Sequence, residues 1–307
     1  MVFKNIKVLV TGGAGFIGSK LSKKLIDLGY DVYIIDNLTT GKKKNIPKGC
    51  TFIKGDLSKK VVYNKIPKGM KYVFHFAAQS SGEISFEKPE YDLNCNVMST
   101  LKILNWSKVN KINRLIFASS MNIYGNVNDK KIDENHPVNP ISFYGIGKYA
   151  SEKYIKIYSN LGVNSTILRL FNIYGPGQNL DNLKQGMISI YLSYITKNKK
   201  LIIKGSLKRF RDFVYIDDLI DACIKSIKEK NKFSIYNVCN GKKITVEDLI
   251  KTIFEVMNKK KHKYIIKKGT PLDQFGIYGN NNKIFKYLKW KPKTKLRDGL
   301  KKMVNEL

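Results

Sequence analysis

The sequence predicts an α/β fold built on a doubly wound parallel sheet of the Rossmann type, with a smaller C-terminal lobe. One observation behind this prediction is an apolar strand at 6–10 that leads into a glycine-rich turn and then into a helical pattern over 16–28. Another is the recurrence of short apolar runs that end in small or polar residues, with room between them for crossover helices. Such runs are typical of parallel strands that are covered on both faces.

The glycine-rich turn has the spacing G-x-x-G-x-x-G, at Gly12, Gly15 and Gly18. In this pattern the first glycine permits a tight turn, the second lets the backbone approach phosphates, and the third lets the helix pack closely on the strand. The free N–H groups of the helix start then face an anion, which predicts a pyrophosphate site. Asp36 ends a second strand at 32–35, where an acidic side chain binds a ribose hydroxyl and repels a 2′-phosphate. We therefore expect NAD rather than NADP.

Further strands are predicted along the first half of the chain, at 51–53, 72–76 and 115–117. Ligands bind beyond the carboxyl ends of parallel strands, so the residues that follow these runs should line one cleft. The clearest crossover helix is predicted over 92–109.

The regular alternation of strands and helices stops near residue 172. We expect an NAD-binding domain over 1–171, with return segments near 212–240, and a mainly substrate-binding lobe over 172–307. The apolar run at 233–238 is expected to rejoin the sheet.

The formal net charge is +32, from 56 lysines and arginines against 24 acidic residues. Such an excess is typical of nucleic-acid-binding proteins. Very few of these basic residues are arginine, however, and the lysines are spread over the whole length. A dedicated nucleic-acid surface concentrates arginine and stacking aromatic residues, so we expect no specific nucleic-acid partner, only weak attraction to polyanions at low salt.

The 4 cysteines and 3 histidines are scattered, without the spacing of disulfide frameworks or metal ligands. We expect reduced thiols and no metal. No apolar run approaches the ~20 residues that cross a bilayer, and no signal-peptide pattern precedes the first strand. These features predict a cytoplasmic protein without a membrane partner.

A second motif, Tyr144-Gly-Ile-Gly-Lys148, indicates chemistry, because residues four apart on a helix share a face and the ammonium then lies beside the phenol. A free tyrosine titrates near ~10, so a general base near neutral pH needs its pKa lowered by roughly 3 units. Lys148 and a positively charged nicotinamide ring are expected to do this together. Ser120, at the end of a predicted strand, can hydrogen-bond the same substrate hydroxyl.

With these motifs the sequence resembles the extended short-chain dehydrogenase/reductase family, in particular its NAD-dependent nucleotide-sugar epimerase/dehydratase branch (UDP-glucose 4-epimerase-like). The resemblance spans nearly the whole chain, at residues 11–18, 36–38, 55–57, 75–79, 96–97, 119–120, 124–125, 144–148, 169–177 and 211–218. It implies a cofactor site made of Gly12, Gly15, Phe16, Ile17, Gly18, Asp36, Asn37, Asp56, Leu57, Ala77, Ala78, Asn96, Tyr144 and Lys148. It also implies catalysis by Ser120, Tyr144 and Lys148, and substrate binding by Ser120, Asn172, Arg211 and Asp273.

The resemblance further suggests which reaction is catalysed. Related 4,6-dehydratases carry Asp and Glu directly after the serine, and decarboxylating members carry Glu at the second of these positions. Here Met121 and Asn122 stand there, and neither transfers a proton at neutral pH. This favours epimerisation, most often at C4, through a keto sugar with NAD regenerated. The alternatives are a CDP-deoxysugar 2-epimerase, a nucleotide-sugar dehydrogenase or dehydratase, and a non-catalytic Rossmann protein that binds polyanions.

Two features of the resemblance concern the substrate and the assembly. Ile277 lies about where related 4-epimerases vary a residue that gates bulk at the C2 of the sugar, and its intermediate size leaves hexose and N-acetylhexosamine both open. In many relatives the helices that correspond to 92–109 and 144–161 pair across a dimer interface, and both segments here have apolar faces. A homodimer is therefore expected.

Overall fold

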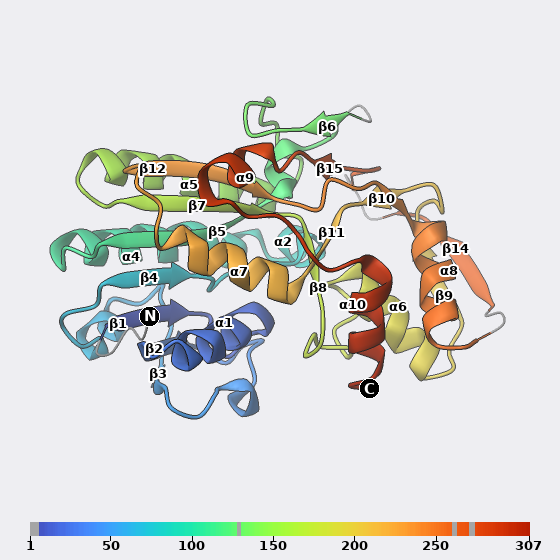
Figure 1. Cartoon of the computed structure of the whole chain (residues 1–307), viewed down its shortest axis with the longest axis horizontal. Coiled ribbons are helices and arrows are strands. Elements are labelled where there is room, and N and C mark those ends of the chain that lie inside the picture. Colours follow the sequence, from blue (N-terminus) through green and yellow to red (C-terminus); the bar gives the residue numbers. More distant parts are fainter. Residues whose placement is uncertain (1–5, 128–129, 260–262, 270–273) are drawn as a thin grey trace.

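The computed structural model describes residues 6–127, 130–259, 263–269 and 274–307. A layered α/β body forms one side of the molecule, and a smaller lobe rich in the last third of the sequence forms the other (Figure 1). The predicted α/β fold class is confirmed.

A seven-stranded sheet with the order β12-β7-β5-β4-β1-β2-β3 forms the centre of the larger body. All its neighbouring strands are parallel. The strands are β1 (Lys7–Thr11), β2 (Asp31–Asp36), β3 (Thr51–Lys54), β4 (Tyr72–His75), β5 (Arg114–Ser120), β7 (Ser165–Leu170) and β12 (Phe233–Val238). The chain thus rejoins the sheet in β12.

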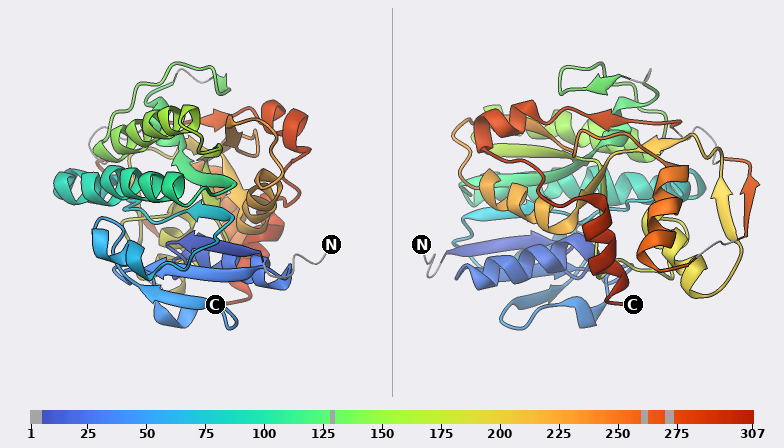
Figure 2. Two further views of the ribbon diagram at one scale, coloured as in Figure 1. Left: turned by 90° about the vertical axis from the view of Figure 1, so that its left-hand side faces the viewer. Right: turned by 45° about the vertical axis from the view of Figure 1, so that its right-hand side comes forward.

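Helices cover both faces of this sheet. Two of them, α4 (Ser99–Val109) and α5 (Phe143–Asn160), lie side by side on one face, and α1 (Phe16–Asp27) and α7 (Ile216–Ser226) lie on the other (Figure 2). Alternate residues of β1 point to opposite faces of the sheet and therefore pack into different hydrophobic clusters. Val8 and Val10 belong to one hydrophobic cluster, whereas Leu9 belongs to the other. This period of two explains why the strand is apolar throughout.

The helix predicted over 92–109 consists of three parts. It begins as α3 (Pro89–Leu93), passes through a π-helical turn (η3, Asn94–Met98) and continues as α4. Hydroxyl groups bind the carbonyls of this turn, since both Thr100 and Ser151 donate to the carbonyl of Asn96. Apolar periodicity cannot reveal this π-helical turn, because one of the hydroxyl groups that bind its carbonyl, that of Ser151, comes from a different helix, α5. Turns of this kind are frequent at functional sites.

Short elements complete the larger body. They are η1 (Lys43–Asn45), η2 (Lys60–Lys65), α2 (Gly82–Glu87), η4 (Met121–Tyr124), β6 (Lys131–Ile132), β15 (Tyr278–Gly279) and α9 (Asn282–Leu288). β15 pairs with β6, so a late segment of the chain lies beside the segment that follows η4.

The smaller lobe contains helices and two-stranded sheets. Its elements are α6 (Met187–Thr196), β9 (Leu201–Lys204), β10 (Phe210–Arg211), β13 (Ile244–Thr245), α8 (Val246–Val256), β14 (Tyr264–Lys267) and α10 (Leu296–Val304). The pair β8 (Asn172–Tyr174) and β11 (Phe213–Tyr215) joins this lobe to the sheet. One hydrophobic cluster runs without a break from the sheet into the lobe.

Several surface and composition features complete the description. Within the described ranges, no helix is both long and apolar enough to cross a membrane. Across the same residues, no group of three or more His, Cys, Asp or Glu could hold a metal ion. All four cysteines are free thiols.

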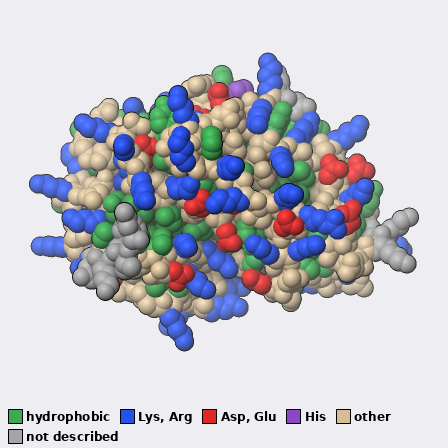
Figure 3. Space-filling model, viewed as in Figure 1, with side chains coloured by type: hydrophobic (Ala, Val, Ile, Leu, Met, Phe, Trp, Pro, Cys, Tyr) green, Lys and Arg blue, Asp and Glu red, His purple; other side chains and the backbone are tan. Residues whose placement is uncertain are grey.

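Lysines and arginines are distributed over the whole face of the molecule seen in Figure 3, across both lobes.

Candidate active site

A cavity of about 1190 Å³ lies between the carboxyl ends of the sheet strands and the smaller lobe. Such a volume exceeds that of an ordinary small-ligand site and is large enough for two ligands. The predicted site residues that line it are Gly12, Gly15, Phe16, Ile17, Gly18, Asp36, Asn37, Asp56, Leu57, Ala77, Ala78, Ser120, Tyr144, Lys148, Asn172 and Arg211. Asp273 lies outside the described residues.

The glycine turn is shaped for close backbone approach. Gly12 has φ +71°, and a Cβ there would lie 2.7 Å from the nitrogen of Ala77. A Cβ at Gly18 would lie 2.2 Å from the carbonyl oxygen of Gly12, so only glycine fits. Gly15 begins α1 without a side-chain cap, which leaves the first N–H groups of the helix available to an anion. This cradle fits the pyrophosphate of a dinucleotide.

Asp36 supports this cradle from the end of β2. Its carboxylate accepts hydrogen bonds from the N–H of Ala14 at 3.0 Å and of Leu38 at 2.8 Å. It is buried but lines the cavity. Each oxygen keeps a lone pair, so the carboxylate can hold the turn and accept from a ribose hydroxyl as well.

A buried hydrogen-bonded chain lies behind the cradle. The hydroxyl of Thr11 accepts from the N–H of Phe76 and of Ala77, so its proton points to Nδ1 of His75 at 2.8 Å. Nε2 of His75 then donates to Thr100, whose hydroxyl donates to a backbone carbonyl of the π-helical turn. Burial, together with the smaller effect of the charge of Lys148, lowers the pKa of His75 to about 3. His75 is therefore neutral, and its two ring nitrogens join β1 to α4 through Thr11 and Thr100.

Asn96 lies behind the cavity wall. It is 1 % exposed, and its amide nitrogen donates to the carbonyl of Gln79 and to the carboxylate of Asp92, both at 3.0 Å. Gln79 in turn binds Ser81, which orders the wall formed by the loop after β4. The oxygen Oδ1 of Asn96 is buried without a hydrogen-bond partner among the described residues. The structure thus places Asn96 as a support of the wall.

The proposed catalytic residues meet where β5 ends. Tyr144 and Lys148 lie one turn apart on α5, and both are buried. The phenol of Tyr144 hydrogen-bonds Ser120. The ammonium of Lys148 donates to the carbonyl of Ala118 at 2.9 Å and lies 4.7 Å from the centre of the Phe117 ring. The three functional groups therefore face one region of the cavity.

The pKa values of this cluster depend strongly on burial. Burial raises the pKa of Tyr144 to about 12, although the hydrogen bond with Ser120 acts in the opposite direction. Burial lowers the pKa of Lys148 to about 8, whereas the carboxylates of Asp92 and Glu152 act to raise it. Lys148 by itself thus does not make the phenol acidic, so the expected lowering depends on the positive ring of a bound NAD.

The positions that discriminate between reactions also lie at the cavity. Met121 and Asn122 line it directly after Ser120. The sulfur of Met121 accepts from the amide nitrogen of Asn172 at 3.5 Å. No proton-transferring side chain therefore stands at these two positions.

Arg211 reaches the cavity but also holds the backbone around it. Its guanidinium donates to the carbonyls of Phe210, Gln274 and Phe275 at 2.8–3.2 Å. It thereby anchors the segment that follows residue 273. The suggestion that Ile277 gates the sugar is wrong in this structure, because Ile277 is completely buried in the core. Gln274 lines the cavity in this segment, with its amide bound to the carbonyl of Gly125.

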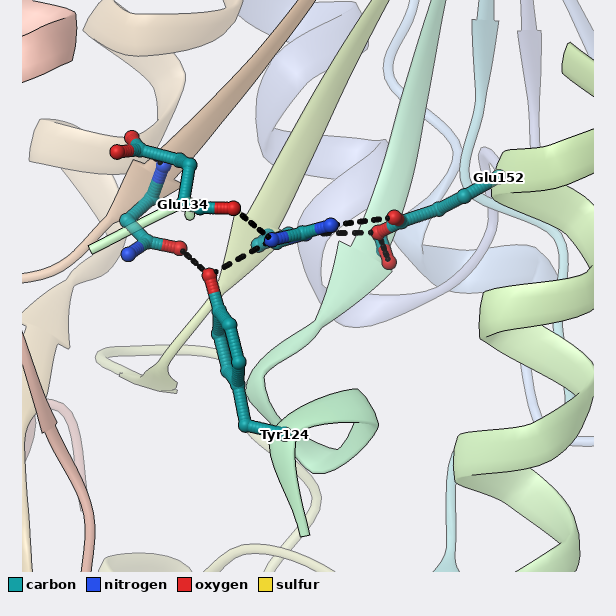
Figure 4. A network of polar contacts seen from close by, with 6 residues as sticks. Tyr124, Glu134 and Glu152 are labelled. Carbon is teal, nitrogen blue, oxygen red and sulfur yellow. Dashed lines mark hydrogen bonds and ion pairs between the residues drawn. The ribbon is translucent and has the colours of Figure 1, made fainter. Parts of the chain in front are cut away.

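A buried polar network, which was not among the predicted site residues, lies beside the catalytic helix. Arg169 of β7 forms a two-pronged ion pair with Glu152 of α5, at 2.8 and 3.1 Å (Figure 4). Arg169 also donates to the hydroxyl of Tyr124 at 2.9 Å and to the carbonyl of Glu134 at 3.1 Å. The spacing of Glu152, eight residues after Tyr144, is the signal in the sequence that could have pointed to it.

Comparisons with known proteins agree with this architecture. A putative UDP-glucose 4-epimerase of Methanocaldococcus jannaschii is 40% identical over 301 residues, which cover 97% of each chain. The structure of a UDP-glucose 4-epimerase of Thermotoga maritima with UDP-glucose superposes with a TM-score of 0.94 at 31% identity, covering 98% of both chains.

Further similar proteins share the same large extent. A UDP-N-acetylglucosamine 4-epimerase of Methanobrevibacter ruminantium in complex with UDP-N-acetylmuramic acid superposes with a TM-score of 0.93 at 30% identity, covering 99% of this chain and 98% of that one. The family described as the NAD dependent epimerase/dehydratase family matches residues 8–239. The chain belongs to the NAD-dependent epimerase/dehydratase family.

Proposed function

We propose that this protein is an NAD-dependent nucleotide-sugar epimerase that inverts C4 of a UDP-hexose or of its N-acetyl form. The observation that carries the proposal is the meeting of Ser120, Tyr144 and Lys148 at one wall of a cavity that also contains the dinucleotide cradle. Met121 and Asn122 offer no acid or base for elimination. Relatives named as UDP-sugar 4-epimerases support the same activity.

The residues of the cradle would hold NAD, which supplies a reversible hydride acceptor when bound. Tyr144, as the phenolate, would take the proton of the C4 hydroxyl as C4 is oxidised, for which the bound cofactor would be the hydride acceptor. The resulting 4-keto sugar turns in the cavity. On reduction of the keto sugar from its opposite face, the phenol of Tyr144 would give its proton back to the C4 oxygen, so no second substrate would be consumed. Ser120 hydrogen-bonds this oxygen throughout, and the charge of Lys148 favours the phenolate.

The other residues are assigned by the same proposal. Gly12, Gly15, Phe16, Ile17, Gly18, Asp36, Asn37, Asp56, Leu57, Ala77 and Ala78 bind the cofactor, with Asn96 acting from behind the wall. Asn172, Arg211 and Asp273 bind the nucleoside diphosphate. We assign cofactor binding to 1–171 with return segments near 212–240, and substrate binding mainly to 172–307.

We also propose that the protein works as a homodimer in the cytoplasm. Exposed apolar side chains gather on the neighbouring helices of one face of the sheet, at Leu93, Met98, Ile146, Tyr154, Ile157 and Leu161. The resemblance to the extended short-chain dehydrogenase/reductase family implies pairing through these helices. Burying such a face against a second copy removes its apolar surface from water.

A panel of nucleotide sugars tests the activity. The protein with NAD is incubated with UDP-glucose, UDP-N-acetylglucosamine, a dTDP-hexose, a CDP-deoxysugar and a GDP-hexose, and the products are resolved by NMR. Inversion at C4 of a UDP-sugar without net NADH supports the proposal. Inversion at C2 of the CDP-sugar, net NADH or loss of water would each replace it with the corresponding alternative. Binding of nucleic acid at physiological salt without any turnover would favour a polyanion-binding protein.

A further inference from the structure

The catalytic helix presents a third buried group beside the two that the proposed reaction uses. Tyr144, Lys148 and Glu152 stand four residues apart on α5, so they lie on one face of the helix. All three are less than a tenth exposed. Glu152 does not belong to the described lining of the cavity, so it does not reach a bound substrate. The role of Glu152 must therefore depend on the residues that its carboxylate contacts.

Glu152 joins two neighbouring strands of the sheet. Ser119 of β5 and Arg169 of β7 stand opposite one another in the parallel ladder. The carboxylate accepts from the hydroxyl of Ser119 at 2.5 Å and from Nε and Nη2 of Arg169 at 3.1 and 2.8 Å. Both oxygens are therefore used, and the helix is attached to two adjacent strands at one level.

The far side of Arg169 is held as well. Its Nη1 donates to the hydroxyl of Tyr124, which donates to the side chain of Asn237 in β12 at 2.7 Å (Figure 4). Burial lowers the pKa of Arg169, but the hydrogen bonds and the charge of Glu152 outweigh burial and raise it, so the guanidinium stays charged. A lysine could not make this fork of contacts. The contacts on both sides of Arg169 thus fix the orientation of its guanidinium, and the ion pair with Glu152 keeps it charged.

We propose that Glu152 is a positioning residue that sets the distance between Ser120 and Tyr144. It does so by accepting a hydrogen bond from Ser119, which directly precedes Ser120 on β5, and it lies on the same face of α5 as Tyr144. On the same helix face, Lys148 binds the carbonyl of Ala118. The helix is therefore attached at three consecutive positions of the strand end, Ala118, Ser119 and Ser120. These three strand residues line the cavity, as do Tyr144 and Lys148, whereas Glu152 lies outside its described lining. The inference rests on the proposed function for its kinetic readout only.

The test removes one arm of this contact and leaves the buried ion pair intact. In Ser119→Ala the strand end loses its bond to Glu152, and we expect kcat per NAD-loaded site to fall about tenfold or more while KM changes little. Ser226→Ala controls for the loss of a buried hydroxyl, because Ser226 is completely buried, lies outside the described lining of the cavity and donates to a backbone carbonyl of α7. The control should keep the wild-type kcat. Crystal structures of the NAD-bound wild type and Ser119→Ala give the distance between Oγ of Ser120 and Oη of Tyr144, which should lengthen.

The outcomes separate this inference from the proposed activity. A kcat of Ser119→Ala equal to that of Ser226→Ala would overturn the positioning role, even if both variants unfold at a lower temperature. If wild type turns over none of the nucleotide sugars, the proposed activity is wrong. The distance between Ser120 and Tyr144 is then the one readout for the positioning role of Glu152. A longer distance in Ser119→Ala then supports the role of Glu152, and an unchanged distance overturns it.

Discussion

The ammonium of Lys148 lies 5.9 Å from the centre of the Tyr144 ring and donates to a backbone carbonyl rather than to the phenol. The lysine therefore acts on the tyrosine through space. Because burial raises the pKa of Tyr144 to about 12, the phenol is neutral in the protein without cofactor. The positively charged nicotinamide ring of bound NAD is what would bring the pKa of Tyr144 toward a useful range.

Tyr144→Phe should abolish turnover and leave NAD bound, since it removes only the proton acceptor. We expect kcat to fall by a factor of about 10² to 10⁴, as is typical for loss of a general acid or base. Tyr158→Phe is the control on the same helix, because Tyr158 bonds Asn105 and does not line the cavity. Product NMR and the content of bound cofactor give the two readouts. Unchanged turnover in Tyr144→Phe would refute the catalytic assignment.

His75 should make stability depend on pH. Its folded-state pKa of about 3 lies below the ordinary value of 6.5, so the unfolded chain takes up a proton that the folded chain refuses. Stability is therefore complete above pH 6.5 and falls as the pH decreases toward 3. Near pH 5 the loss should be about 2 kcal/mol.

Urea unfolding of wild type and His75→Gln at neutral and acidic pH isolates this effect. The free energy of unfolding of wild type should fall more steeply with acidification than that of the variant, which has no imidazole to protonate in the unfolded chain. Equal slopes would mean that His75 is not held neutral in the folded protein.

Gly18→Ala should damage the cofactor cradle, because the added Cβ would lie 2.2 Å from the carbonyl oxygen of Gly12. The backbone of the turn must then move, and we expect the Kd for NAD to rise about tenfold or more. Gly82→Ala is the control, since Gly82 also lines the cavity but a Cβ there would meet nothing within 4 Å. Titration calorimetry measures both. Equal affinity in the two variants would contradict the tight fit.

Arg169→Met should destabilise the protein by about 3–5 kcal/mol, because it leaves the buried carboxylate of Glu152 without its counter-charge. The double variant Arg169→Met/Glu152→Leu removes both charges and should lose less than the sum of the single changes. Chemical denaturation of the three variants measures the coupling. Additive losses would show that the ion pair contributes no net interaction.

Ile157→Glu should prevent dimer formation, since Ile157 is 54% exposed on the apolar face of α5. Light scattering should give the mass of two chains for wild type and of one chain for the variant. Val61→Glu, at a position 65% exposed on η2, should remain dimeric. A wild-type mass of one chain would remove the dimer proposal.

Local sequence patterns determined the larger part of the fold and the centre of the candidate site. The glycine turn, the acidic end of β2 and the i, i+4 pair Tyr144 and Lys148 depend on neighbours within one or two elements, so their spacing alone indicates their geometry. β7 was not predicted, because its residues Ser165 to Leu170 mix apolar with polar and charged side chains although all are buried.

Tertiary structure decided what depends on contacts between distant segments. Arg169 can lie in a buried strand only because Glu152 of α5 neutralises it, and Arg211 meets carbonyls more than sixty residues along the chain. Asn96 lies in a π-helical turn, and its amide nitrogen bonds the carbonyl of Gln79, a residue of a different loop. Periodicity records which side of an element is apolar, whereas the partner of a buried polar group is chosen by the packing of elements that the sequence leaves far apart.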